Sequence, residues 1–302
     1  MKATSLAVLA AAALVLGHSR EGEAQTARFR YAAAVYVDDK GAGLNRPEGV
    51  ACDARGVVIV ADTGNDRLLR FTYQDKTVAG GTEIRIPELS APVRVRISSK
   101  GELYALDGRQ HRIVHLGADG QFKDVLSYAG APAPSSVMVK SFTLDDQDNV
   151  YVLDVPGARV LILDGAGQFQ KALPLPADAG FVSDLAVDSQ GRVILLDSIA
   201  RRIYSAARGA EGFAALGGDL TATLTTLPTG IAASKGTIFV AEGIGGNIVS
   251  FGQDGSFLAR QLTEGRAEGS LEYPSQMCFT GKDEMLVADR DNSRVQVFSV
   301  IR

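Results

Sequence analysis

Arg94 and Arg96 are the residues of this sequence whose type and spacing most directly suggest binding chemistry. They stand two residues apart in the β-rich segment 93–97, and alternate residues of a strand share one face. Guanidinium groups are costly to bury unless they meet anions. The pair therefore predicts either a site for an anionic ligand or an internal ion pair with acidic neighbours such as Glu48 and Asp53.

Other residues that could do chemistry are sparse. His18 falls in the N-terminal segment, which leaves His111 and His115, four residues apart and expected near one face of a strand. Two histidines without a third ligand do not make a catalytic zinc site. The run 145–149 is rich in Asp and Asn, but it lacks the glycine and terminal glutamate of the helix-loop-helix calcium loop. We predict an ordinary turn there and no cofactor, with Ca²⁺ as the alternative. The sequence has no nucleophile-elbow, phosphate-loop or dinucleotide motif.

A repeated pattern must position these residues. An acidic residue is followed five positions later by Arg, and the acidic residues recur 43 to 47 residues apart. This spacing indicates a repeat architecture. A group needed in every repeat is structural, so we expect each carboxylate to bind turn amides or to pair with Arg across the turn. The pairs are Asp62 and Arg67, Asp107 and Arg112, Asp154 and Arg159, Asp197 and Arg202, and Asp289 and Arg294, with Glu242 and Asn247 as a variant.

Each repeat has the signature of four short antiparallel strands. Apolar, β-rich runs flank every acidic residue, and Gly or Asp stands six positions before it, where a turn must open the strand. Helical periodicity is absent, which excludes helical solenoids. The sequence therefore predicts an all-β, six-bladed β-propeller. The expected blades are 44–88, 89–134, 135–178, 179–225, 226–270 and 271–302 together with 28–38.

The last blade needs a strand from the other end of the chain. The sixth repeat stops at Arg302 without room for a fourth strand, whereas the β-rich segment Phe29–Val37 precedes the first repeat and belongs to none. We expect this segment to complete the last blade, because pairing the two ends removes exposed sheet edges.

Two stretches carry a family resemblance. Pro47–Phe71 and Val287–Phe298 resemble NHL repeats, the units of six-bladed propellers. The resemblance covers roughly residues 44 to 300 and departs most at Glu242 and Asn247. The family includes binding scaffolds in many settings and a minority of enzymes, among them propeller lyases that use metal-bound histidines. The resemblance therefore implies the fold far more than the function.

Positions where one repeat differs from its siblings are the better site candidates. Arg94 and Arg96 match uncharged residues in most other repeats, and Asp184 is the corresponding acidic departure. We expect a ligand-binding rim or channel on the face where the inner strands begin, because loops on a rigid scaffold carry binding. An ordinary polar rim is the alternative. The candidate residues are Arg46, Glu48, Arg94, Arg96, Lys140, Asp184 and Gln276.

The N-terminus has the layout of a secretory signal peptide. Met1 and Lys2 precede an apolar run from Leu6 to Leu16, and cleavage after Ala24 would leave a single propeller domain over 25–302. The apolar run is too short to span a membrane. We therefore expect an exported protein, periplasmic or extracellular, without a membrane span after cleavage.

Cys52 and Cys278 could form a disulfide in an exported protein. Superimposing Asp62 on Asp289 leaves the two cysteines one residue out of step, on opposite strand faces of equivalent strands. From this offset we predict two buried free thiols.

The absence of catalytic signatures favours a monomeric binding scaffold for a protein, peptide or glycan over an enzyme. The alternative is a hydrolase or lyase that uses Ca²⁺ or Zn²⁺ in the central channel. The net charge of −4 argues against a nucleic-acid partner.

Overall fold

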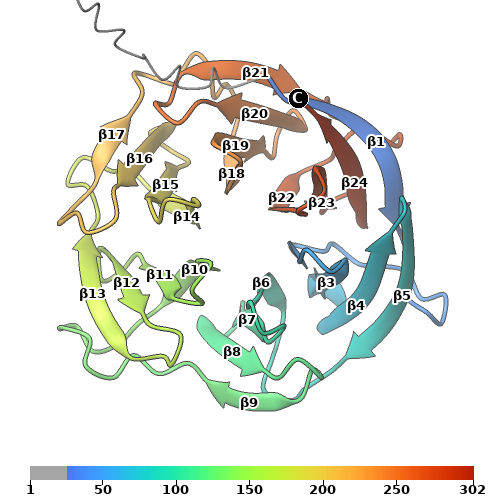
Figure 1. Cartoon of the computed structure of the whole chain (residues 1–302), viewed down its shortest axis with the longest axis horizontal. Helices are drawn as coiled ribbons and strands as arrows, with labels where there is room; N and C mark the ends of the chain where they lie inside the picture. The colour runs from blue at the N-terminus through green and yellow to red at the C-terminus, as the bar shows by residue number, and fades with distance from the viewer. Residues whose placement is uncertain (1–25) are drawn as a thin grey trace, which may run out of the picture.

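The computed structural model describes residues 26–302, so the predicted signal segment 1–24 lies outside the described residues. The described chain forms six four-stranded antiparallel sheets arranged as blades around a central axis (Figure 1). The prediction of an all-β, six-bladed propeller is confirmed. None of the helices within residues 26–302 has the length and hydropathy of a membrane span.

Blades 1 to 3 follow one another along the chain, each from its inner to its outer strand. Blade 1 contains β2 (Gly49–Cys52), β3 (Val57–Asp62), β4 (Arg67–Gln74) and β5 (Thr77–Ile84), with the short 3-10 helix η1 (Thr63–Asn65). Blade 2 contains β6 (Pro92–Ile97), β7 (Leu103–Asp107), β8 (Arg112–Leu116) and β9 (Phe122–Val125). Blade 3 contains β10 (Val139–Leu144), β11 (Val150–Asp154), β12 (Arg159–Leu163) and β13 (Phe169–Pro174).

Blades 4 and 5 repeat this order, and blade 6 draws its outer strand from the start of the described chain. Blade 4 contains β14 (Val182–Val187), β15 (Val193–Asp197), β16 (Arg202–Ala206) and β17 (Ala214–Leu216). Blade 5 contains β18 (Pro228–Ser234), β19 (Thr237–Glu242), β20 (Asn247–Phe251) and β21 (Phe257–Gln261). Blade 6 contains β22 (Pro274–Phe279), β23 (Glu284–Asp289), β24 (Arg294–Ile301) and β1 (Arg28–Val35).

The ring is closed by strands from both ends of the chain. β1 pairs antiparallel with β24, with Phe29 opposite Val300 and Val35 opposite Val295, and the two strands lie side by side in Figure 1. The predicted completion of the last blade by the N-terminal segment is therefore confirmed. The pairing leaves β24 without a free edge.

Six apolar layers between neighbouring blades hold the ring together. The second strand of each blade is buried almost throughout, as in β7, β11 and β15, because it packs against a neighbour on both faces. Each apolar cluster combines residues of two consecutive blades, and one cluster joins blade 6 to blade 1. The core is thus distributed around the ring, between the blades.

The turn between the first and second strands has the same backbone conformation in every blade. The residue six positions before the repeated acid has a positive φ in all six blades, a conformation that Gly adopts at little cost and Asp tolerates. The residues are Gly56, Gly101, Asp148, Gly191, Gly236 and Asp283.

The repeated acidic residue fastens the segment that leads into the inner strand. Its carboxylate is fully buried in all six blades and accepts a hydrogen bond from a backbone amide 16 or 17 residues upstream. Asn45 donates to Asp62 at 2.7 Å, and Glu272 donates to Asp289 at 2.6 Å. Buried carboxylates need such donors. The upstream amides belong to Asn45, Ser90, Met138, Phe181, Thr226 and Glu272.

The arginine of the repeat is used less uniformly. The guanidinium pairs with the acid in three blades, through Asp62–Arg67, Asp154–Arg159 and Asp289–Arg294, at 2.8, 2.9 and 2.6 Å. In blade 5, where Asn247 replaces Arg, Arg260 of the outer strand pairs with Glu242 instead.

In blades 2 and 4 the repeated acid binds turn amides, the other of the two expected arrangements, and does not pair with the arginine of its own repeat. Backbone amides occupy the carboxylates of Asp107 and Asp197. Arg112 donates to the Glu88 carbonyl at 2.9 Å, and Arg202 pairs with Asp178 at 2.7 Å.

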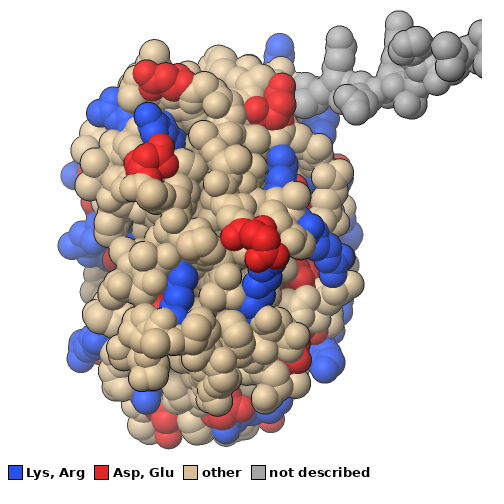
Figure 2. All heavy atoms as spheres, turned by 90° about the vertical axis from the view of Figure 1, so that its left-hand side faces the viewer, with Lys and Arg blue, Asp and Glu red and all other residues tan. Residues whose placement is uncertain are grey.

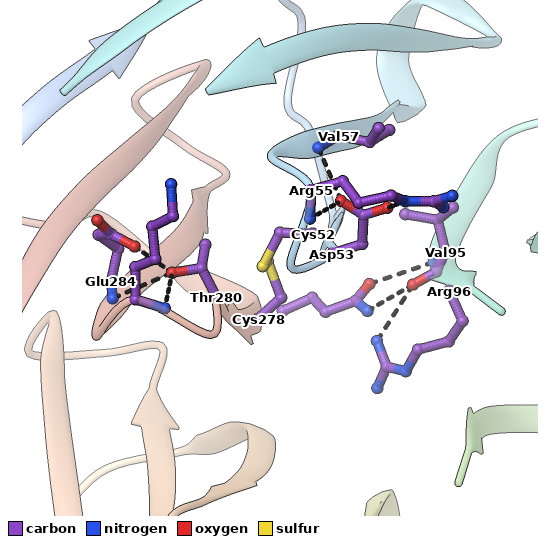
Figure 3. Close-up of a disulfide and its surroundings, with 11 residues drawn as sticks. Cys52, Asp53, Arg55, Val57, Val95, Arg96, Cys278, Thr280 and Glu284 are labelled. Carbon is purple, nitrogen blue, oxygen red and sulfur yellow. Dashed lines mark hydrogen bonds and ion pairs between the residues drawn. A yellow bond between two sulfur atoms is a disulfide. The ribbon is translucent and has the colours of Figure 1, made fainter. Parts of the chain in front are cut away.

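The prediction of two free thiols is wrong. Cys52 at the end of β2 and Cys278 in β22 form a disulfide whose Cα atoms are 5.9 Å apart, a separation normal for such bonds. The disulfide joins the inner strands of blades 1 and 6 (Figure 3).

The physical reason lies in how blades stack. Each blade presents one face to the next blade and the opposite face to the previous one. Side chains that meet across a blade interface therefore come from opposite faces of equivalent strands. The one-residue offset between Cys52 and Cys278 brings them onto the two facing surfaces, and both contact the apolar cluster between blades 1 and 6.

Candidate functional site

A cavity of about 510 Å³ opens on the face where the inner strands begin. We call it the upper cavity. Its walls come from the first residues of β6, β10 and β18 and from the loops that follow the repeated acids. Its charged side chains are Glu48, Arg94, Lys140 and Arg290, and His111 and Tyr273 also line it.

Lys140 supplies an available positive charge. It is the second residue of β10, it is exposed, and it has no carboxylate within ion-pair distance among residues 26–302. Its Nζ atom lies 5.5 Å from the ring centroid of Phe181, which borders the same cavity. A cation over an aromatic face is held in position by a contact worth about 0.5–1 kcal/mol at an exposed site. The ammonium is thus oriented yet open to an anion.

Arg290 forms the opposite wall and is already partly neutralised. Its Nε atom donates to Glu48 at 3.1 Å and its Nη1 atom to Asp291 at 3.1 Å. Its Cζ atom lies 4.9 Å from the ring centroid of Tyr273. This arrangement fixes a guanidinium and an aromatic ring at the cavity wall.

An apolar groove continues from the upper cavity across blades 4 and 5. Ile199 and Leu227 border both the cavity and a neighbouring depression of about 460 Å³, which Ile244 also lines. Ile199 and Ile244 occupy equivalent loop positions, two residues after the repeated acid, and are 71% and 58% exposed. A contiguous patch of large apolar side chains with this much exposure indicates a contact surface.

The floor of the upper cavity is a polar network centred on Asp184. Its Oδ2 atom lies 3.4 Å from Nη2 of Arg94 and accepts from the amide of Ile231 at 3.0 Å. Its Oδ1 atom accepts from the Ser141 hydroxyl at 2.6 Å. Arg94 also donates to the Thr229 carbonyl at 3.3 Å. The network connects the inner strands of blades 2, 3, 4 and 5 and satisfies a carboxylate that is only 2% exposed.

Gln276 extends this floor to blade 6. Its side-chain amide donates to the Val95 carbonyl at 2.9 Å and accepts from the Val95 amide at 3.3 Å. The contact passes in front of Gly49 in blade 1, where a Cβ atom would lie 3.0 Å from Gln276 Oε1 and 3.2 Å from Arg94 Cα. A residue without a side chain is needed at Gly49 for this approach.

The residues chosen from the sequence are divided among several places. Glu48, Arg94 and Lys140 line the upper cavity, and Asp184 and Gln276 lie in its floor. Arg46 stands outside it and pairs with Asp291 at 3.3 Å.

Arg96 is separated from Arg94, because it lines a second cavity at the other end of the inner strands. Strand alternation places both side chains toward the axis, and it does not specify the end toward which each one leans. The two arginines therefore line different cavities.

Sequence reasoning missed Arg290, Phe181 and Ile199. The signal for Arg290 was present: the residue directly after the repeated acid is Arg290 in the last blade and Thr, Gly, Val, Ser or Gly in the others. Phe181 and Ile199 are hydrophobic residues in loops, and only the folded ring shows that they are exposed around one cavity.

The two histidines do not act together. His111 lies in the turn before β8, with φ 52°, and lines the upper cavity. His115 lies within β8, stacks on Tyr104 at 4.3 Å between centroids and contacts Glu102 at 3.1 Å. Within residues 26–302, no three His, Cys, Asp or Glu side chains gather as a metal site requires. The donor set of the upper cavity therefore does not fit a metal-dependent lyase or lactonase.

The turn 145–149 behaves as an ordinary turn. The Asp145 carboxylate accepts from the amides of Gln147 and Asn149, each at 2.9 Å. Asp148 instead accepts from the amide of Ser99 at 2.7 Å, in the neighbouring blade. These carboxylates are occupied by backbone and inter-blade contacts.

Charges on the outer side of the ring are scattered. Figure 2, viewed from the side of β13 and β17, shows Lys and Arg interspersed with Asp and Glu. No continuous surface of one sign is visible on this side.

Comparison with known proteins supports the architecture. The sequence model of the NHL repeat matches residues 44–71, which contain β2, β3 and much of β4. No curated protein matches the sequence.

Solved structures resemble the fold over most of the chain. Virginiamycin B lyase from Staphylococcus aureus has 15% identity and a TM-score of 0.64, covering 91% of this chain and 100% of the lyase chain. A gluconolactonase from Xanthomonas campestris has 17% identity and a TM-score of 0.64, covering 91% and 90%. A chain of a nidogen–laminin complex has 16% identity and a TM-score of 0.59, covering 72% and 80%. At such identities these likenesses show the shared fold alone.

Proposed function

We propose that this protein is an exported binding propeller whose upper cavity holds an acidic peptide segment of a partner protein. The observation that carries the proposal is the meeting, in one cavity of about 510 Å³, of exposed apolar side chains with Lys140, the one cation of its lining that has no carboxylate partner among residues 26–302. The disulfide supports export, because disulfides persist in oxidising compartments.

The charged residues of the upper cavity and the apolar groove would bind two different parts of the ligand. A carboxylate side chain would meet Lys140, which has no anionic partner of its own among residues 26–302. An aliphatic or aromatic residue a few positions away would lie in the groove of Ile199, Leu227 and Ile244. Recognition of an extended segment by charge and by apolar pockets together is a recurring mode of peptide binding. A glycan would leave the three exposed aliphatic side chains without a partner.

The proposal is tested with labelled peptides. Fluorescein-labelled hexapeptides that combine Glu or Asp with Leu, Ile or Phe are titrated by fluorescence anisotropy, alongside a matched set with Lys in place of the acidic residues. Only the acidic set is expected to bind. Lys140→Glu and Ile199→Asp should each weaken binding by about tenfold or more.

Lys282→Glu is the matched control, because Lys282 is an exposed lysine in the turn between β22 and β23, where the inner strand ends, and it does not line the upper cavity. It should leave peptide affinity unchanged. Equal binding of acidic and basic peptides, or equal weakening by the control variant, would refute the proposal.

A metal-dependent hydrolase or lyase is the second candidate, and it rests on the likeness to virginiamycin B lyase and gluconolactonase. The described residues do not bring together three His, Cys, Asp or Glu side chains that would hold the metal. Elemental analysis of the purified protein and assays with virginiamycin B and gluconolactone test this candidate. One tightly held Ca²⁺ or Zn²⁺ per chain together with turnover would favour it over the binding scaffold.

A further inference from the structure

A second cavity, of about 280 Å³, lies where the inner strands end, opposite the upper cavity. We call it the lower cavity. Its lining includes Arg96 and Ile97 of β6, whereas the upper cavity is lined by Val93 and Arg94 of the same strand. The disulfide borders the lower cavity, and Figure 3 shows Arg96 extending from its strand toward the middle of the ring.

Equivalent positions of all six blades surround this cavity, and only one of them is charged. The equivalent residues are Ala51, Arg96, Thr143, Ala186, Ile231 and Cys278, and all six line the lower cavity. Arg96 is the only charged side chain in the lining. A single blade thus places a cation in a ring of small and apolar side chains.

No anion of the described chain neutralises Arg96. Its Nε atom donates to the Thr143 hydroxyl at 3.2 Å, and its Nη1 atom donates to its neighbour's carbonyl, Val95 O, at 3.2 Å. Both acceptors are neutral, and Nη2 has no hydrogen-bond partner within residues 26–302. Arg94 differs in this respect, because Asp184 lies 3.4 Å from its Nη2 atom.

The surroundings make this positive charge costly. Burial lowers the pKa of Arg96 to about 10, a net shift that Asp184 opposes and the like charge of Arg94 reinforces. The guanidinium remains protonated at neutral pH. An anion that enters the lower cavity would recover electrostatic energy that burial has removed.

We propose that the lower cavity binds a small carboxylate with an apolar body. The carboxylate accepts from Nη2 of Arg96 and from the hydroxyl of Thr143, which is free to donate because it only accepts from Arg96. The apolar body lies against Ala186, Ile231 and Phe279. One guanidinium in a largely apolar lining suits a singly charged carboxylate, whereas a phosphate dianion would need further donors. This site is independent of the proposed peptide site at the other end of the ring.

The test uses benzoate and butyrate as probes. They are titrated into ¹⁵N-labelled full chain in low-salt buffer without other carboxylates or phosphate, and the side-chain Nε–H resonance of Arg96 is followed by NMR. Arg96→Lys, which keeps the positive charge, identifies this resonance by its loss. Saturable movement of the resonance is expected, with affinity about tenfold or more weaker in Arg96→Gln, followed through backbone amides around the cavity.

Arg55→Gln is the matched control. Arg55 lies in the β2–β3 turn, its side chain is 61% exposed, and it does not line the lower cavity. Benzoate affinity should be unchanged in this variant. A wild-type Arg96 resonance that does not saturate, or binding that survives Arg96→Gln, would overturn the proposal. The wild-type titration decides the matter even if Arg96→Gln does not fold, and neither result bears on peptide binding at the upper cavity.

Discussion

The carboxylate of Asp184 and the guanidinium of Arg94 meet across the central axis, with Oδ2 and Nη2 3.4 Å apart. Asp184 lies in β14 of blade 4 and Arg94 lies in β6 of blade 2, so the ion pair joins blades that are separated by a third. Asp184 also bonds Ser141 of blade 3 and Ile231 of blade 5. One side chain therefore fixes the relative positions of four inner strands.

Asp184→Asn should destabilise the ring. The substitution leaves the Arg94 charge without its partner in a mostly buried site, which costs about 3 kcal/mol. Arg94→Met removes both the positive charge and the need to neutralise it. The loss in free energy of unfolding in the double variant should therefore be smaller than the sum of the losses in the two single variants. Urea unfolding of the four proteins, analysed as a double-mutant cycle, measures this coupling. Strict additivity would show that the two groups do not interact.

Reduction of the Cys52–Cys278 disulfide should lower stability. The bond closes a segment of 226 residues and restricts the unfolded chain, an effect of about 2–4 kcal/mol in typical proteins. The midpoint of urea unfolding should therefore fall when a reductant such as TCEP is added. The variant Cys52→Ser with Cys278→Ser should unfold at the reduced midpoint and should not respond to the reductant. A reductant effect that persists in this variant would have another origin.

Arg159 and Arg202 occupy equivalent positions and should respond differently to substitution. Arg159 is 4% exposed, pairs with Asp154 and donates to the carbonyls of Pro132 and Pro134. Arg159→Gln should lower the free energy of unfolding by about 3 kcal/mol, because it leaves the buried carboxylate of Asp154 without its ion-pair partner. Arg202 pairs with Asp178 at the surface, and Arg202→Gln should cost less than about 1 kcal/mol. Thermal and urea unfolding compare the two variants. Equal losses would mean that the repeat arginine has the same role in every blade.

Asp38 should make the contact between the β1–β2 segment and blade 1 sensitive to acid. The amide of Ala42 donates to Asp38, Arg67 pairs with it at 2.7 Å, and these contacts hold the pKa of Asp38 below its ordinary value of 3.8. The stabilisation is complete above that ordinary value and is lost as the pH falls through the lower folded-state pKa.

Asp38→Asn should therefore lower the urea midpoint at pH 7, and the difference from wild type should shrink as the pH approaches 3. Asp39→Asn offers a neighbouring control whose side chain does not pair with Arg67. A difference between Asp38→Asn and wild type that is constant with pH would assign the effect to the lost hydrogen bonds alone.

The fold could be predicted because the repeat encodes local turns. The left-handed residues Gly56 and Asp148 stand at the same distance from their acids, and this regularity is visible in the sequence. The closure could also be predicted, because the last repeat lacks a strand that Phe29–Val37 can supply.

The site could be predicted only in part, because its geometry depends on relations between blades. Comparison of equivalent positions placed Cys52 and Cys278 on opposite faces, whereas stacked blades bring opposite faces together. The same comparison grouped Arg94 with Arg96, although the two side chains lean toward different ends of the axis. Strand periodicity specifies the face of the strand on which a side chain lies, but it does not specify the end of the ring axis toward which that side chain leans.

The pairing of β1 with β24 has a consequence for biosynthesis. β1 begins at Arg28, whereas its partner β24 spans Arg294–Ile301, so the nascent propeller cannot close until β24 has left the ribosome. Until then β1 has no partner strand, and the surfaces of blades 1 and 6 that face each other in the closed ring remain exposed to solvent. A prematurely terminated chain would keep these surfaces exposed and be prone to aggregation.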